Sequence, residues 1–191
     1  MSRKNNLANF LTRPAHEVAP DLLGCIIERR VGVRVLRGKI VETEAYDQTD
    51  AASHSYGGET PRTQVMFGPP GYLYIYFTYG MHYCCNIVVG EIGNGAAVLI
   101  RAIEPLKGID FMKQRRGRAG VELTNGPAKL CQALAINKEQ NGVDLSDGEV
   151  RLVINKSGAP AETVTTTRIG ISRNVDMPWR FYIKDSPFVS R

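Results

Sequence analysis

The chain has 191 residues, of which 43% are hydrophobic and 23% charged, and 24 Lys and Arg against 19 Asp and Glu give it a net charge of +5. A chain of this length and composition can bury one sizeable core, so we expect a single domain over residues 1–191. No apolar run approaches the roughly 20 residues that span a bilayer, and the first residues lack the apolar segment of a signal peptide. We therefore expect an unexported, cytoplasmic protein without a membrane partner.

The first predicted element is a short helix over residues 16–23, which ends at Gly24 because glycine readily adopts the left-handed conformation found after helices. Three β-type runs follow, over residues 25–30, 33–36 and 39–46. A short turn at Gly32 separates the first two, and residues 37–38 lead into the third. We interpret the three runs as a meander.

The run over residues 39–46 holds two carboxylates and an aromatic ring in a strand pattern. Because successive strand side chains point to opposite sides, we expect one face to share alternate residues, namely Ile40, Glu42, Glu44 and Tyr46. The other face should then carry Val41, Thr43 and Ala45. Carboxylates are depleted in strands, so at least one of the two glutamates is expected to serve more than solvation.

Residues 47–70 form a polar segment too long for a plain connector, and loops of this length are usually functional. A strand over residues 72–78 follows, with three tyrosines on one face: Tyr72, Tyr74 and Tyr76. The chain then turns at residues 79–80, returns over residues 81–89, and continues into a buried strand over residues 96–102.

The remaining elements alternate between helix and strand. We expect a basic helix over residues 109–116 and a second helix opening at residues 124–127, where Pro127 suits the first turn. The buried face of the second helix is predicted to carry Leu130, Ala133, Leu134 and Ile136. Strands are predicted over residues 151–154, 163–171 and 180–183. The fold class is therefore α+β, with a curved antiparallel sheet and packed helices.

Four cysteines, Cys25, Cys84, Cys85 and Cys131, show no C-x-x-C pair and no Cys/His spacing typical of zinc sites. We expect reduced, mostly buried thiols, no metal site and no cofactor.

Most of the excess positive charge is local. Residues 101–129 contain seven basic residues against three acidic ones, a net charge of +4. Such a patch is a candidate contact for a phosphate backbone, with Arg116 and Lys129 as its candidate residues. On charge alone, a solvated helix end and loop explains the patch equally well.

Five other residues could take part in binding or chemistry. Tyr79 is out of phase with the preceding tyrosines and lies beside Gly80, so its ring should protrude and could wedge between stacked bases. Met81 lies close to it in the chain and is also predicted to contact DNA. His54 lies among small residues that allow a ligand to approach. Arg101 and Asn86 lie in apolar strands and need polar partners, and Glu44 is a natural partner for Arg101.

Several runs in the same order resemble the alkyladenine (3-methyladenine) DNA glycosylases of the mammalian-type, non-helix-hairpin-helix superfamily. The runs cover residues 41–46, 52–55, 74–86, 98–105, 125–134, 168–171, 180–182 and 186–190. The resemblance spans nearly the whole chain. The sequence lacks the long N-terminal extension of vertebrate members, so we expect a compact bacterial-type form. Such a protein would be nucleoid-associated if bacterial.

The resemblance implies roles for individual residues. Glu44 matches the general base that activates water, and Arg101 and the carbonyl of Ile169 match groups that help hold that water. The residues that enclose the flipped base correspond to Tyr46, His54 and Tyr76. Tyr79 matches the ring that fills the gap in the duplex, and Asn86 matches an asparagine that crowds the 2-amino group of guanine.

The implied activity is that of a monofunctional DNA glycosylase acting, without cofactor or lyase step, on damaged purines in double-stranded DNA. The implied lesions are 3-methyladenine, hypoxanthine, ethenoadenine and 7-methylguanine, and we expect a monomer. Two alternatives stay open from the residues alone. A non-catalytic nucleic-acid-binding module would explain the tyrosines and the basic patch. A nuclease could hold magnesium through Glu42, Glu44, Asp47 and Asp50.

Overall fold

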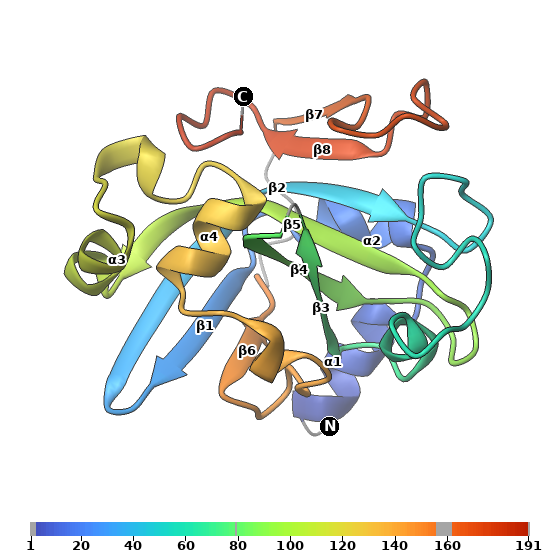
Figure 1. The fold of residues 1–191 in the computed structure, drawn as a ribbon, viewed down its shortest axis with the longest axis horizontal. Coiled ribbons are helices and arrows are strands. Elements are labelled where there is room, and N and C mark those ends of the chain that lie inside the picture. Colours follow the sequence, from blue (N-terminus) through green and yellow to red (C-terminus); the bar gives the residue numbers. More distant parts are fainter. Residues whose placement is uncertain (1–2, 79, 156–161, 191) are drawn as a thin grey trace.

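The computed structural model describes residues 3–78, 80–155 and 162–190 (Figure 1). Its helices are α1 (Arg3–Leu11), α2 (Ala15–Asp21), α3 (Ile109–Arg116) and α4 (Pro127–Ala133), with short 3-10 turns η1 (Gln64–Phe67), η2 (Gly120–Leu123) and η3 (Lys138–Gln140). Its strands are β1 (Ile26–Val31), β2 (Arg34–Tyr46), β3 (Leu73–Thr78), β4 (His82–Val88), β5 (Ala97–Lys107), β6 (Val150–Val153), β7 (Thr163–Thr166) and β8 (Arg180–Ile183). No helix in these ranges is long and apolar enough to cross a membrane.

The strands form one antiparallel sheet in the order β3-β4-β5-β2-β1-β6. The long strand β2 changes partner along one edge, pairing first with β1 and then, from residue 42, with β8, which in turn pairs with β7. Figure 1 shows β7 and β8 lying above the end of β2. The predicted α+β fold with a curved antiparallel sheet is confirmed.

One face of the sheet builds the main hydrophobic core. Residues of this face, such as Ala45, Cys85 and Ile100, are fully buried in one cluster with α1, α2 and α4. The hydroxyl of Thr43 on the same face donates to the carbonyl of Ala19 in α2, at 2.9 Å. Burying this face leaves the opposite face free to carry polar groups.

The opposite face aligns residues from four neighbouring strands. Glu44 of β2 pairs with Leu99 of β5, Leu99 pairs with Asn86 of β4, and Asn86 pairs with Tyr74 of β3. Since directly paired antiparallel residues point to the same side, this register brings side chains from distant parts of the sequence into one row.

Two compensating bulges shape the centre of this sheet. Val41 is an extra residue on β2 between the pairs formed by Ile40 and Glu42, and Arg101 is an extra residue on β5 opposite Glu42 and Thr43. The first bulge corrects the predicted alternation, because it moves Ile40 to the core face, where it joins the main cluster. Glu42, Glu44 and Tyr46 keep the predicted common face.

The predicted three-strand meander is wrong. Residues 34–46 form one continuous strand, so β1 and β2 make a hairpin around residues 32–33. Gly38 lies within β2 and does not turn the chain. It sits at a register shift, where a Cβ would come within 2.4 Å of the Ile103 side chain. Glycine is needed there for close packing, not for a turn.

The later elements largely follow the prediction, with α3 at residues 109–116 and α4 opening at Pro127. Two bounds differ. The strand expected over residues 96–102 continues to Lys107, and the strand expected over residues 163–171 ends at Thr166. In the second case, the chain leaves the ladder and Gly170 takes a positive φ of 75°. The four cysteines are free and buried, as expected.

Candidate active site

A pocket of about 360 Å³ opens on the polar face of the sheet. Its walls come from β2, the loop after β2, β3, β4, β5, the start of α4 and residues 169–171. The volume lies within the roughly 300–1,000 Å³ of typical small-ligand sites. The pocket therefore gathers segments that are far apart in the sequence, including most of the residues singled out from it.

Aromatic rings form much of the pocket wall. The ring of His54 meets the ring of Tyr76 edge-on at 4.5 Å between centroids, and its Nδ1 lies 3.1 Å from the Tyr74 hydroxyl. Tyr46 lines another part of the wall. The structure thus brings together the three residues predicted to enclose a base, and adds Tyr74.

These rings are uncharged at neutral pH. Burial, together with the nearby Glu44 carboxylate, raises the pKa of Tyr46 well above its usual value, and burial raises that of Tyr76 in the same direction. Burial and the positive charge of Arg62 lower the pKa of His54 to about 4. The wall therefore offers flat, neutral π surfaces suited to a planar ligand.

Glu44 lies directly behind this wall and is fully buried. Its Oε2 accepts hydrogen bonds from the Tyr46 hydroxyl at 2.9 Å and from Arg101 Nη1 at 3.1 Å. Its Oε1 accepts one from the main-chain N–H of Ile169 at 2.8 Å. All three donors belong to residues that line the pocket. Because a carboxylate oxygen can accept at least two bonds, Oε1 keeps capacity for a further donor.

Arg101 reaches both buried carboxylates, as its need for a partner predicted. Its Nε donates to Glu42 Oε1 at 3.0 Å, in addition to the contact of its Nη1 with Glu44. Burial alone would lower the pKa of Arg101, but Glu44 and Glu42 raise it, so the guanidinium stays charged. The bulge at residue 101 gives this side chain its place between the two carboxylates.

Asn86 is buried in the pocket wall, and its Nδ2 donates to the carbonyl of Tyr74 at 3.1 Å. This contact satisfies the amide nitrogen that an apolar strand would otherwise leave unpaired. It also fixes the direction of the side chain beside Leu99 on the pocket face.

The family model for methylpurine-DNA glycosylase matches residues 9–187. The chain belongs to the methylpurine-DNA glycosylase family. It is a DNA glycosylase, a hydrolase of N-glycosidic bonds with DNA as its substrate, which confirms the resemblance noted in the sequence.

Relatives match over nearly their full length. A proposed 3-methyladenine DNA glycosylase of Carboxydothermus hydrogenoformans is 54% identical over 185 residues, covering 95% of this chain and 96% of the relative. Similarly named proteins of Methanoculleus marisnigri and Francisella tularensis are 48% and 45% identical, covering 96% and 98% of this chain and 97% and 99% of each relative.

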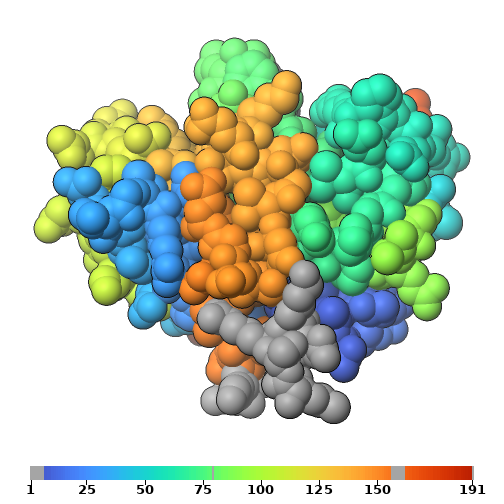
Figure 2. Space-filling view, turned by 90° about the horizontal axis from the view of Figure 1, so that it is seen from below, coloured from blue at the N-terminus to red at the C-terminus, as the bar shows by residue number. Residues whose placement is uncertain are grey.

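For a DNA glycosylase, the exposed rim around the pocket matters as well. Figure 2 shows the end of the β3–β4 hairpin, in green, standing out from the surface. Phe77 and Met81 near this end are 50% and 68% exposed. Tyr79, the predicted wedge, lies outside the described residues.

The predicted phosphate contacts lie on the other side of the fold from the loop after β2, around α3 and α4 (Figure 1). Lys129 Nζ lies 2.8 Å from Asn125 Oδ1 and is partly exposed. Arg116 uses Nε, Nη1 and Nη2 on the carbonyl of Leu123, the side chain of Gln132 and the carbonyl of Glu122. Contact between Arg116 and phosphate stays a prediction. The three hydrogen bonds also give Arg116 a structural role.

The four carboxylates proposed as magnesium ligands of a nuclease have other partners. Glu42 and Glu44 accept from Arg101, the Asp50 carboxylate pairs with Arg168, and Asp47 caps Thr49 within its own turn. Among the described residues, no group of three or more His, Cys, Asp or Glu side chains is placed to hold a metal ion. The carboxylates are engaged with arginines and local donors.

Sequence reasoning missed the buried pair of Asp50 and Arg168. Both side chains are fully buried, and Asp50 also accepts from Asn174 Nδ2 at 2.7 Å. The guanidinium of Arg168 stacks 4.7 Å from the ring of Tyr46 and donates to the carbonyl of Ala45. The pair thus joins the loop that carries His54 to the segment that carries Ile169. In the sequence, Arg168 follows three threonines at residues 165–167, a context that does not itself predict a buried ion pair.

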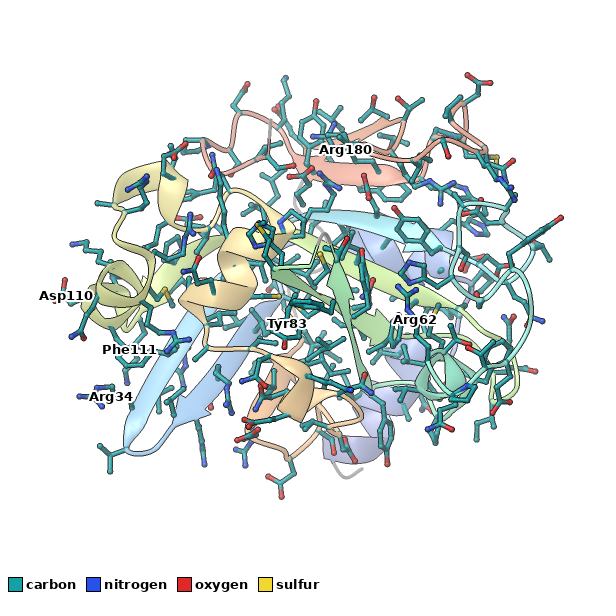
Figure 3. The ribbon with its side chains drawn as sticks, viewed as in Figure 1. Arg34, Arg62, Tyr83, Asp110, Phe111 and Arg180 are labelled. Atoms are coloured by element: carbon teal, nitrogen blue, oxygen red, sulfur yellow. The ribbon has the colours of Figure 1, made fainter. Side chains whose placement is uncertain are left out.

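Sequence reasoning also missed Arg62 at the pocket rim. Its Nη2 lies 3.4 Å from His54 Nε2, and its guanidinium lies 5.9 Å from the centre of the Tyr76 ring (Figure 3). This cation is part of the reason that His54 stays neutral.

Proposed function

We propose that this methylpurine-DNA glycosylase flips a damaged purine out of duplex DNA into the pocket and cleaves its N-glycosidic bond with a water molecule activated by Glu44. The observation that carries the proposal is the position of Glu44. Its carboxylate sits behind a neutral aromatic wall and is held by three donors that all line the pocket. Stacking between aromatic side chains suits every purine, because every base has a π face.

Glu44 would act as the general base. Its Oε1 accepts one bond from Ile169 and keeps a lone pair that could accept from the attacking water, whose proton it would take as the C–O bond forms. Arg101 and the Tyr46 hydroxyl hold Oε2 and fix the orientation of the carboxylate. Ile169, whose carbonyl we predict as a further water contact, lies at this wall.

The lesions proposed are 3-methyladenine, hypoxanthine, ethenoadenine and 7-methylguanine. An alkylated purine is a cationic leaving group, so its departure needs little acid catalysis, whereas neutral hypoxanthine needs more help. Asn86, fixed by its bond to Tyr74, would crowd the 2-amino group of guanine. The relatives named for 3-methyladenine support this class of substrate.

We also propose that the enzyme is monofunctional and acts as a monomer, with residues 1–191 as one domain. No lysine is among the described residues that line the pocket, which supports hydrolysis rather than a Schiff base. In the cell, such an enzyme would act in the cytoplasm, on nucleoid DNA if bacterial.

The test is release of free base from duplex DNA that contains a single hypoxanthine, with excess EDTA present. The proposal expects free hypoxanthine and an abasic strand that breaks only after alkali treatment. Strand breakage without alkali, or base release that stops in EDTA, would contradict it. Duplex with adenine at the same position is the matched control.

A further inference from the structure

A second fully buried carboxylate, Glu42, lies two residues before Glu44 on the same face of β2. Its Oε1 accepts from Arg101 Nε at 3.0 Å, Arg180 Nε at 2.7 Å and Ser190 Oγ at 2.8 Å. Its Oε2 accepts from the main-chain N–H of Ser190 at 2.6 Å. Arg180 comes from β8, which lies along β2 (Figure 3).

This cluster holds Arg101 from the side away from the pocket. Arg101 Nε bonds to Glu42, its Nη1 bonds to Glu44, and its Nη2 donates to Ser190 Oγ at 3.1 Å. The guanidinium is therefore fixed at three nitrogens. Of the partners of Glu42, only Arg101 lines the pocket, whereas all three donors to Glu44 do, so Glu42 lies one contact further from the substrate than Glu44.

We propose that Glu42 is a positioning residue that keeps Glu44 basic by taking a share of the positive charge of Arg101, with Arg180 and Ser190 holding Glu42 in place. The inference rests on the proposed role of Glu44 as the base. The two carboxylates and two guanidiniums form a balanced cluster in which Arg101 is shared. Without the charge of Glu42, Arg101 pairs with Glu44 alone, and a carboxylate paired in this way accepts a proton less readily.

The other titratable groups near Glu44 are either neutral near pH 7 or paired with an opposite charge. Tyr46 on its own strand is protonated and donates to it, and Arg168 behind Tyr46 is neutralised by Asp50. The remaining titratable residues of the described pocket wall are His54, Tyr74, Tyr76 and Cys84. Burial, with the charge of Arg62, lowers the pKa of His54 to about 4, and burial raises that of Cys84 to about 11, so neither ring nor thiol is charged near neutral pH.

The experiment is single-turnover release of hypoxanthine from duplex DNA as a function of pH, for wild type, Glu42→Gln and Arg180→Met. In Glu42→Gln, the acidic limb of the profile should move to lower pH by about one unit, and the plateau rate should fall. In Arg180→Met, the limb should move to higher pH, because Glu42 then competes more strongly for Arg101. Opposite shifts from one cluster are not expected from general loss of packing.

Two variants that keep every charge serve as controls. Glu42→Asp should show the wild-type limb. Ser190→Ala removes one donor to Glu42 and the acceptor for Arg101 Nη2 but keeps the main-chain N–H bond to Glu42, so it should leave the limb in place even if the plateau falls. Thermal unfolding of each variant reports whether it folds. If Glu42→Gln does not fold, the shift in Arg180→Met decides alone.

The outcomes separate this inference from the proposed function. If Glu44→Gln abolishes release but the limb of every folded variant among Glu42→Gln and Arg180→Met superimposes on wild type, the role of Glu42 is refuted and that of Glu44 stands. If Glu44→Gln remains active, the proposed function itself fails, and the role of Glu42 with it.

Discussion

Replacing Arg168 with methionine should destabilise the protein strongly, because it leaves the carboxylate of Asp50 buried without its cation. Both side chains are fully buried, and removing one partner of such a pair costs about 3–5 kcal/mol. For a protein of this size, 1 kcal/mol corresponds to about 2–4 °C in Tm. The Arg168→Met variant should therefore melt about 10 °C below wild type.

The pair of Asp50 and Arg168 also determines how the stability of the fold changes with pH. Burial alone would raise the pKa of Asp50 above 3.8, but Arg168, the N–H of Ala52 and Asn174 hold it lower. A carboxyl with a lowered pKa in the folded state stabilises the fold above its usual pKa and loses that contribution as pH falls through the folded value. Wild type should thus lose stability as acid is added below about pH 4, and Arg168→Met should show a shallower loss.

A double-mutant cycle measures the coupling. Thermal and urea unfolding would be followed for Arg168→Met, Asp50→Asn and the double variant. The double variant should lose no more stability than Arg168→Met alone, since the unpaired charge is then absent. Simply additive losses would show that Asp50 and Arg168 are not energetically coupled. Because Arg168 backs the ring of Tyr46, folded Arg168→Met should also release base more slowly.

Three further predictions concern DNA and lesion recognition. Lys129→Ala or Arg116→Ala should weaken DNA binding equally on all sequences and reduce the slope of log affinity against log salt concentration by about one. An unchanged slope in both variants would show that the basic patch is an ordinary solvated face. Arg116→Ala should also lower Tm. Asn86→Ser should excise guanine lesions more readily relative to adenine lesions, and unchanged discrimination in competitive base-release assays would point to another selector. Tyr79→Ser should shift the base-flipping equilibrium toward the stacked state by about ten- to a hundredfold. The loss of single-turnover rate should be larger for a well-paired lesion than for a lesion in a bulge. Equal losses on the two duplexes would rule out Tyr79 as the wedge.

The alternation of side chains along strands predicted much of the site. Glu44, Tyr46, Tyr74 and Tyr76 share the pocket face because a period of two, once in register, holds over several residues. The prediction for Ile40 was wrong because a bulge adds one residue and reverses the faces beyond it. Sequence alone does not reveal a bulge, since its cause lies in the pairing with β5.

Contacts between distant segments could not be predicted from local pattern. Asp50 and Arg168 are 118 positions apart, and Glu42 and Ser190 are 148 apart. The apolar surroundings of Arg101 did indicate a buried partner, because a buried charge must be paired. They did not indicate that Glu42 shares Arg101 with Glu44, because that contact depends on the bulge at residue 101 in the pairing of β5 with β2.

The most direct test of the account is Glu44→Gln, measured by single-turnover release of hypoxanthine together with binding to DNA that holds an abasic site. The amide keeps the shape of the side chain but cannot take the proton of water, so release should be abolished while binding stays near wild type. Glu42→Asp, which keeps its charge and lies outside the pocket, is the control for disturbance of the buried cluster. Release by Glu44→Gln within about tenfold of wild type would contradict Glu44 as the base.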